Sequence, residues 1–175
     1  MTPNDYLELR KKLVNWLYDY LSFNKKEGFV IGLSGGIDSL TLALLAHEAT
    51  RRLKGKFLAL ISKMDSAYDY VDNSYAQKAV QIYGFPSEFL DLSVPFNALS
   101  GVLPEKSDSA TFTNLKARLR TAVLYYYANN QNLLVLGTVN RGEFMIGYFP
   151  KNSSAGDILP MARLSKQDIR GIAET

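Results

Sequence analysis

The fold of this chain is decided by the stretch FVIGLSGGIDS, residues 29–39. Its apolar run at 29–33 predicts a buried strand, and the apolar pattern that resumes over 40–53 predicts a helix. Between them, two glycines allow a tight turn and let backbone N–H groups come close to an anion. We therefore expect a strand, an anion-binding loop and a helix N-terminus within this one stretch.

The polar side chains of the loop indicate which anion it takes. Ser34 and Ser39 add hydroxyl donors, and together with Gly35 and Gly36 they would surround phosphate oxygens. A carboxylate at Asp38 would repel phosphate unless a divalent cation lay between them, and Mg²⁺ shared with phosphates fits this arrangement. The Walker A and G-x-G-x-x-G patterns are both missing from the sequence. A plain glycine turn would need neither the serines nor the aspartate, so we favour a nucleotide phosphate site with Mg²⁺.

Composition narrows the class of protein. A chain of 175 residues with 47% apolar and 21% charged residues is typical of one soluble domain, here 1–175. It has no cysteine, which excludes disulfides and thiolate chemistry, and its single histidine argues against zinc. A net charge of +3 does not indicate nucleic-acid binding. No apolar run reaches the roughly 18 residues of a membrane helix, and no signal peptide is evident. We expect a cytoplasmic protein that binds no membrane.

Strand and helix patterns alternate along the chain. Apolar runs predict further buried strands at 56–61, 87–92 and 132–137. Helices are expected at 4–21, 67–83 and 108–130, and a loop at 94–104. This order predicts an α/β fold with a doubly wound, mostly parallel, Rossmann-like sheet and helices on both faces. Because ligands bind beyond the carboxyl ends of such strands, residues just after Leu33, Ile61, Leu92 and Leu136 should share one cleft.

A second group of motifs follows the last predicted strand. It comprises GTVNRGEFMIGYFPK at 137–151, GDILP at 156–160 and LSK at 164–166. Their order, together with the first loop and NLKARLR at 114–120, resembles the ammonia-dependent NAD synthetases, which are a branch of the ATP pyrophosphatases. The resemblance extends over nearly the whole chain.

The resemblance implies an ATP-dependent amide ligase with a fold of the adenine nucleotide alpha hydrolase type. Such an enzyme amidates deamido-NAD (nicotinic acid adenine dinucleotide) with ammonia through an adenylylated intermediate and yields NAD, AMP and pyrophosphate. Its cofactor is Mg²⁺, ATP is its co-substrate, and it is a homodimer. Neither chemical step requires a protein nucleophile, so positioning and electrostatics can supply most of the catalysis.

The resemblance also implies roles for individual residues. The ATP-binding residues would be Ser34, Gly35, Gly36, Ser39, Arg120, Thr138 and Lys166. Asp38 and Glu143 would hold the metal and, with Lys166, form the catalytic set. The remaining substrate would be bound by Asn140, Lys151 and Asp157. Arg118 and Arg120 lie two residues apart on a helix and cannot share a face, so we expect only Arg120 to enter the cleft.

Three departures from the family pattern leave alternatives open. Val139 stands where the family has glycine, and the segment 152–157 is shorter and lacks the first of the two acidic residues in the family pattern. The chain also ends at Thr175, before the lid segment that family members carry. One alternative is another ATP pyrophosphatase, similar to the GMP synthetases or the tRNA thiolation enzymes. The other is a catalytically weak nucleotide-binding relative.

Apolar residues on the predicted N-terminal helix exceed what one packing face needs. Leu13, Trp16, Leu17 and Tyr20, with the tyrosine run at 125–127, therefore favour a homodimer. His47 lies on the predicted helix that follows the glycine loop, and we expect it to have a structural role.

Overall fold

The computed structural model describes residues 1–64, 67–104, 108–153 and 156–175. Within these ranges the chain alternates between helices and strands, as the sequence predicts. The elements are α1 (Pro3–Asn24), β1 (Gly28–Gly32), α2 (Ile37–Leu53), β2 (Lys56–Lys63), α3 (Ala67–Tyr83), β3 (Ser87–Asp91), α4 (Ser93–Ser100), α5 (Ser109–Gln131), β4 (Leu133–Leu136), α6 (Arg141–Ile146) and α7 (Lys166–Ala173).

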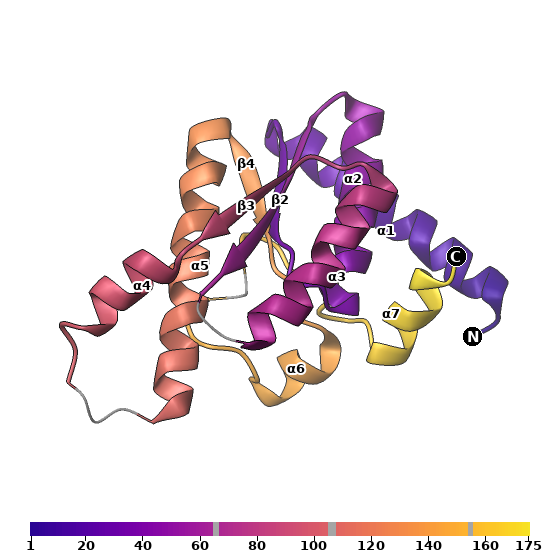
Figure 1. The fold of residues 1–175 in the computed structure, drawn as a ribbon. Helices are drawn as coiled ribbons and strands as arrows, with labels where there is room; N and C mark the ends of the chain where they lie inside the picture. Colours follow the sequence, from indigo (N-terminus) through magenta and orange to yellow (C-terminus); the bar gives the residue numbers. More distant parts are fainter. Residues whose placement is uncertain (65–66, 105–107, 154–155) are drawn as a thin grey trace.

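The strands form a parallel sheet in the order β3-β2-β1-β4 (Figure 1). The chain builds the sheet outward from β1 through β2 to β3 and then returns to place β4 on the other side of β1. The order therefore reverses between β1 and β4, which is where ligands of open α/β sheets bind. A parallel bridge between Leu136 and Ile158 extends the sheet beyond β4.

Both faces of the sheet are covered, which confirms the doubly wound prediction. Phe29 and Ile31 of β1 pack in the cluster that contains buried residues of α1, α2 and α7. Val30, which points to the opposite face, packs with Ala128 of α5 in a second cluster. Figure 1 shows α5 on one side of the sheet and α1 and α2 on the other. Alternate strand residues thus bury both faces, as continuous apolar runs require.

The prediction of a loop at 94–104 is wrong, because Ser93–Ser100 form helix α4. Pro95 is compatible with this helix since it lies in the first turn, where backbone N–H groups have no helical partner. Phe96 is buried with Met64 and Leu92, and Phe112 of α5 packs against this group. The helix therefore depends on contacts with distant segments that no local pattern of residues predicts.

The N-terminal helix buries more of its apolar surface than the dimer prediction assumed. Leu17 is fully buried in the core and so cannot form an interface, whereas Leu13 and Tyr20 are partly buried against that core. Trp16 remains 42% exposed and Phe23 86% exposed. In the tyrosine run, the hydroxyls at 125 and 127 donate to Asp157 and Glu88, and only the middle ring is largely exposed.

Helix α7 packs closely against α1. A Cβ added at Gly171 would lie 2.4 Å from Cε2 of Tyr6, so only glycine allows this approach. Arg10 of α1 also donates to the backbone oxygen of Thr175, and Figure 1 shows the two chain ends near each other. This packing places the N-terminus of α7, with Lys166, beside the carboxyl end of β1.

No helix in the described ranges has the length and apolar character needed to cross a membrane.

Candidate nucleotide and metal site

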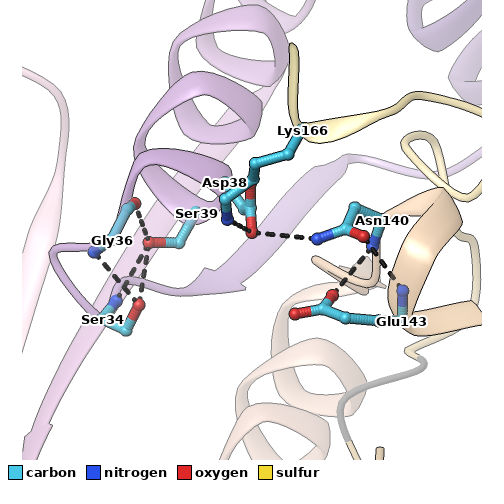
Figure 2. A network of polar contacts seen from close by, with 7 residues as sticks. All are labelled: Ser34, Gly36, Asp38, Ser39, Asn140, Glu143 and Lys166. Carbon is cyan, nitrogen blue, oxygen red and sulfur yellow. Dashed lines mark hydrogen bonds and ion pairs between the residues drawn. The ribbon is translucent and has the colours of Figure 1, made fainter. Parts of the chain in front are cut away.

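The loop after β1 is held by its own serines. Gly36 N–H donates to Oγ of Ser34 at 3.3 Å, and Ser34 N–H donates to Oγ of Ser39 at 3.3 Å. The Ser39 hydroxyl donates to the Gly36 carbonyl at 2.9 Å, and the two serine oxygens lie 3.1 Å apart. Figure 2 shows these bonds closing the loop into a compact turn. Ser34 and Ser39 are thus neighbours in this loop, and their contact with phosphate stays a prediction.

The two loop glycines serve different purposes. Gly35 has φ of 86°, a backbone conformation that side chains rarely adopt. Gly36 has φ of −73°, which any residue adopts, and a Cβ there would meet only Oγ of Ser34 at 3.5 Å. Gly35 is therefore required by the turn. The turn does not require Gly36, whose missing side chain instead leaves open the space in front of the helix N-terminus.

Helix α2 begins without a side-chain cap. Its N-cap residue is Gly36, so no side chain accepts a hydrogen bond from the first-turn N–H groups. The positive end of a 17-residue helix therefore faces the loop. An anion at this position would gain both the N–H donors and the favourable field of the helix.

Asp38, in the first turn of α2, is the centre of a polar cluster. Its Oδ2 atom accepts from Nζ of Lys166 at 2.5 Å and from Nδ2 of Asn140 at 3.4 Å (Figure 2). Its Oδ1 atom is buried and has no hydrogen-bond partner among the described residues. The Asp38 side chain is 15% exposed, whereas that of Lys166 is 46% exposed. A buried carboxylate oxygen without a partner is the kind of ligand that a hard cation prefers.

Asn140 and Glu143 form the start of helix α6. Glu143 N–H donates to Oδ1 of Asn140 at 3.1 Å, and Asn140 N–H donates to Oε2 of Glu143 at 3.0 Å. This reciprocal pair is a capping box, which fixes both side chains at the carboxyl end of β4. The spacing N-x-x-E in the sequence could have predicted it.

The cluster fits Mg²⁺ better than a metal held by protein alone. Within the described residues, no three His, Cys, Asp or Glu side chains come together as a metal site. Mg²⁺ is commonly bound through one or two carboxylates, with phosphate oxygens and water completing its shell. Asp38 and Glu143, linked through Asn140, match that donor set.

A cavity of about 270 Å³ lies between the sheet and α5, next to the glycine loop. Its lining includes Ser34, Ser62 and Thr138, which lie just after Leu33, Ile61 and Leu136 as the sequence predicts. Near β3 the lining residue is Leu92 itself and not a residue after it. Arg120 of α5 also lines it, and its Nε donates to Oγ of Ser62 at 3.0 Å. Arg118 instead lies on the exposed side and donates to the carbonyl of Lys151. The prediction that only Arg120 enters the cleft is confirmed. The sequence placed the position after Ile61 in this cleft, but the bond of Ser62 to Arg120 was not predicted.

Lys151 and Asp157 lie outside this cluster. Lys151 is exposed, and its carbonyl accepts from Arg118. Asp157 accepts from the backbone N–H of Val135 at 2.8 Å and from the Tyr125 hydroxyl at 3.2 Å, so its carboxylate serves the edge strand β4. Burial, followed by the charge of Asp157, raises the pKa of Tyr125. Their predicted contact with substrate stays a prediction, and residues 154–155 between them lie outside the described ranges.

Lys166 is placed by a second capping box. Ser165 and Asp168 bond reciprocally across the first turn of α7, and the hydrogen bonds from Ser165 hold the pKa of Asp168 below its ordinary value.

Val139, which departs from the family pattern, is buried and its φ is not positive, so valine is accommodated there without backbone strain.

Comparison with known proteins relates the chain to one family. The family model described as NAD synthase matches residues 9–175. NH3-dependent NAD+ synthetases are 40% identical in Mycoplasma genitalium, over 94% of this chain, and 37% identical in Malacoplasma penetrans, over 95%. The chain spans 66% of the length of each of these relatives. The solved structure of NMN synthetase from Francisella tularensis superposes with a TM-score of 0.86 at 33% identity, over 99% of this chain and 70% of that one.

Proposed function

This chain belongs to the NAD synthase family, and on that premise we propose that it is an ATP-dependent ligase that converts a nicotinate carboxylate to an amide with ammonia. In the proposed function, residues 1–175 act as one ATP-pyrophosphatase domain. Deamido-NAD, ATP and ammonia are its substrates, and NAD, AMP and pyrophosphate are its products.

The proposed reaction has two steps. The nicotinate carboxylate oxygen attacks the α-phosphorus of ATP, and the bond between that phosphorus and the bridging oxygen breaks to release pyrophosphate. Ammonia then attacks the acyl carbon, the bond to AMP breaks, and the nitrogen loses a proton to give the amide. Both steps are substitutions between substrates, so the protein has to position them and stabilise the charge that develops.

The charge-stabilising groups come from separate elements. The serines of the loop and the N-terminus of α2 would hold phosphate oxygens, and Thr138 and Arg120 would contact the nucleotide from the cavity. Lys166 is half exposed and could exchange its bond to Asp38 for one to the departing pyrophosphate. Asp38 and Glu143 would hold Mg²⁺, which when bound neutralises phosphate charge.

One observation carries this proposal. The glycine loop after β1 and the segment after β4 meet through the bond between Asn140 and Asp38, at the point where the strand order reverses. The first of these segments has the pattern of an ATP pyrophosphatase, and the second has the motifs of the NAD synthetases. Their meeting beside one cavity is what ATP and a carboxylate substrate would need in order to react together.

A second substrate has specific support. The relative from Francisella tularensis is named an NMN synthetase, and amidation of nicotinate mononucleotide is a reaction that yields NMN. In this chain the segment 152–157 is shorter than the family pattern and lacks the first acidic residue of that pattern, although it keeps Asp157. We therefore include amidation of nicotinate mononucleotide as the second candidate.

The test is an incubation with ATP, Mg²⁺, ammonia and either deamido-NAD or nicotinate mononucleotide, followed by separate assays for AMP and for the amide. Equal amounts of AMP and amide support the proposal and identify the substrate. AMP without amide would instead indicate another acceptor, as in the GMP synthetases or tRNA thiolation enzymes. Binding of ATP without AMP release would indicate a nucleotide-binding relative.

The proposal also includes a location and an assembly. We expect the enzyme to act in the cytoplasm, which supplies ATP. A homodimer remains part of the proposal, supported by the exposed rings of Trp16 and Phe23 on α1 and Tyr126 on α5.

A further inference from the structure

Asn140 is a buried polar residue that joins two carboxylates. Its side chain is the N-cap of α6, and the residue is only 6% exposed. Its backbone N–H donates to the Glu143 carboxylate, and its side-chain Nδ2 donates to Asp38. Its side-chain Oδ1 accepts from the backbone N–H of Glu143. Figure 2 shows Asn140 between the two acidic side chains. Asp38 and Glu143 come from different helices, α2 and α6, so Asn140 is their connection.

The orientation of the Asn140 amide follows from the cap. Glu143 N–H donates to one end of the amide at 3.1 Å, so that end must be the oxygen. The other end is then the NH₂ group, which can only donate, and it faces Oδ2 of Asp38 at 3.4 Å. Although this bond is long, its direction is decided by the short contact at the other end of the amide.

We propose that Asn140 is a positioning residue that holds the Asp38 and Glu143 carboxylates in the arrangement that binds a divalent cation. This inference rests on the proposed function and deepens its metal site. It also gives Asn140 a different role from the substrate contact that the sequence suggests. The residue acts through the two carboxylates and does not itself touch the cation.

An asparagine suits this task for an electrostatic reason. Asp38 uses Oδ2 for Lys166 and Asn140, while its buried Oδ1 has no partner among the described residues. Lys166 also holds Oδ2, but its positive charge competes with a metal. The amide of Asn140 is neutral, so it can keep the carboxylate oriented without weakening the attraction for a cation.

The structure supplies a substitution that separates this role from helix capping. Asn140→Ser keeps an N-cap hydroxyl that accepts from Glu143 N–H, but the shorter side chain does not reach Asp38. Asn140→Thr does the same with a different side-chain shape and serves as the second variant if the serine variant does not fold. Asp108→Ala is the matched control, because it removes the N-cap of α5 outside the cluster.

The experiment measures Mn²⁺ binding to the protein without nucleotide, from the loss of the free-ion signal in electron paramagnetic resonance. We expect Asn140→Ser and Asn140→Thr to bind Mn²⁺ about tenfold more weakly than the wild type, the lower end of the effect seen for residues that orient metal ligands. Their melting temperatures should stay close to that of the wild type. Asp108→Ala should melt a few degrees lower and bind Mn²⁺ as the wild type does.

The outcomes separate this inference from the proposed function. If Asp38→Asn loses Mn²⁺ binding but both Asn140 variants bind like the wild type, the positioning role is overturned and the metal site stands. If Asp38→Asn binds Mn²⁺ as well as the wild type does, the metal site fails and the positioning role fails with it. A tenfold loss in the Asn140 variants that excess Mn²⁺ restores supports the inference.

Discussion

Nζ of Lys166 lies 2.5 Å from Oδ2 of Asp38, although 128 residues separate them along the chain. The lysine holds the carboxylate that we propose as a metal ligand, so in the absence of nucleotide it competes with a cation for that oxygen. The Lys166 side chain is 46% exposed, so its ammonium group can exchange this bond for one to phosphate.

Lys166→Gln should therefore change two measurements in opposite directions. Mn²⁺ affinity without nucleotide should rise roughly two- to fivefold, because a competing cation is removed. The rate of AMP formation should fall by at least about tenfold, because the group that would meet pyrophosphate is gone. Loss of Mn²⁺ affinity in this variant would contradict the proposal that Lys166 competes with a cation for Asp38.

Asp38→Asn and Glu143→Gln should each raise the Mg²⁺ concentration needed for ATP cleavage by at least about tenfold, because each removes one charged oxygen ligand. Glutamine at 143 can keep the capping box of α6, so its melting temperature should match that of the wild type. The measurement is AMP formation as a function of Mg²⁺ concentration. An unchanged Mg²⁺ dependence in Glu143→Gln would remove that residue from the ligand set.

The two loop glycines should respond differently to substitution. Gly35→Ala places a side chain at φ of 86° and should destabilise the fold by about 1–2 kcal/mol. Gly36→Val should fold normally, since φ of −73° suits valine, but should abolish ATP binding by filling the space in front of α2. Thermal unfolding and ATP titration of both variants check this pair. Tight ATP binding by folded Gly36→Val would refute the loop assignment.

His47 should make stability depend on pH near neutrality. It stacks on Phe57 and meets Phe85 edge-on, and burial, followed by the charge of Arg51, lowers its pKa below 6.5. The folded state therefore binds the proton less readily than the unfolded state, so this stability is complete above pH 6.5 and is lost as the pH falls through the folded pKa. Denaturant unfolding between pH 7.5 and 5.5 should show this loss, and His47→Gln should reduce the slope. Equal slopes of stability against pH in the wild type and in His47→Gln would contradict a contribution from His47.

A homodimer should be present at micromolar concentration if the exposed rings of α1 form its interface. Trp16→Glu should then sediment as a monomer, whereas Leu17→Ala should lose stability instead, because Leu17 is fully buried in the core. Sedimentation velocity at about tens of micromolar distinguishes these outcomes. A monomeric wild type at that concentration would disprove the dimer.

Much of the fold could be predicted from local sequence. The apolar runs became the strands of a parallel sheet, and the serines and glycines after β1 became the turn before α2. The sequence also predicted the cleft beyond the strand ends, and it predicted that Arg120 and not Arg118 lines this cleft. These features depend on neighbouring residues and on general rules of α/β topology, so the linear pattern contains them.

The tertiary structure alone decided which polar groups meet. Helix α4 exists because Phe96 is buried against Met64 and Phe112, and the carboxylate of Asp157 is used by the backbone of β4. Likewise, Lys166 reaches Asp38 only because α7 packs closely on α1. The sequence by itself determined the local elements and the chemical groups of the site. Which of these groups pair is determined by the tertiary structure, because contacts between distant segments form only where packing brings their side chains within hydrogen-bond distance.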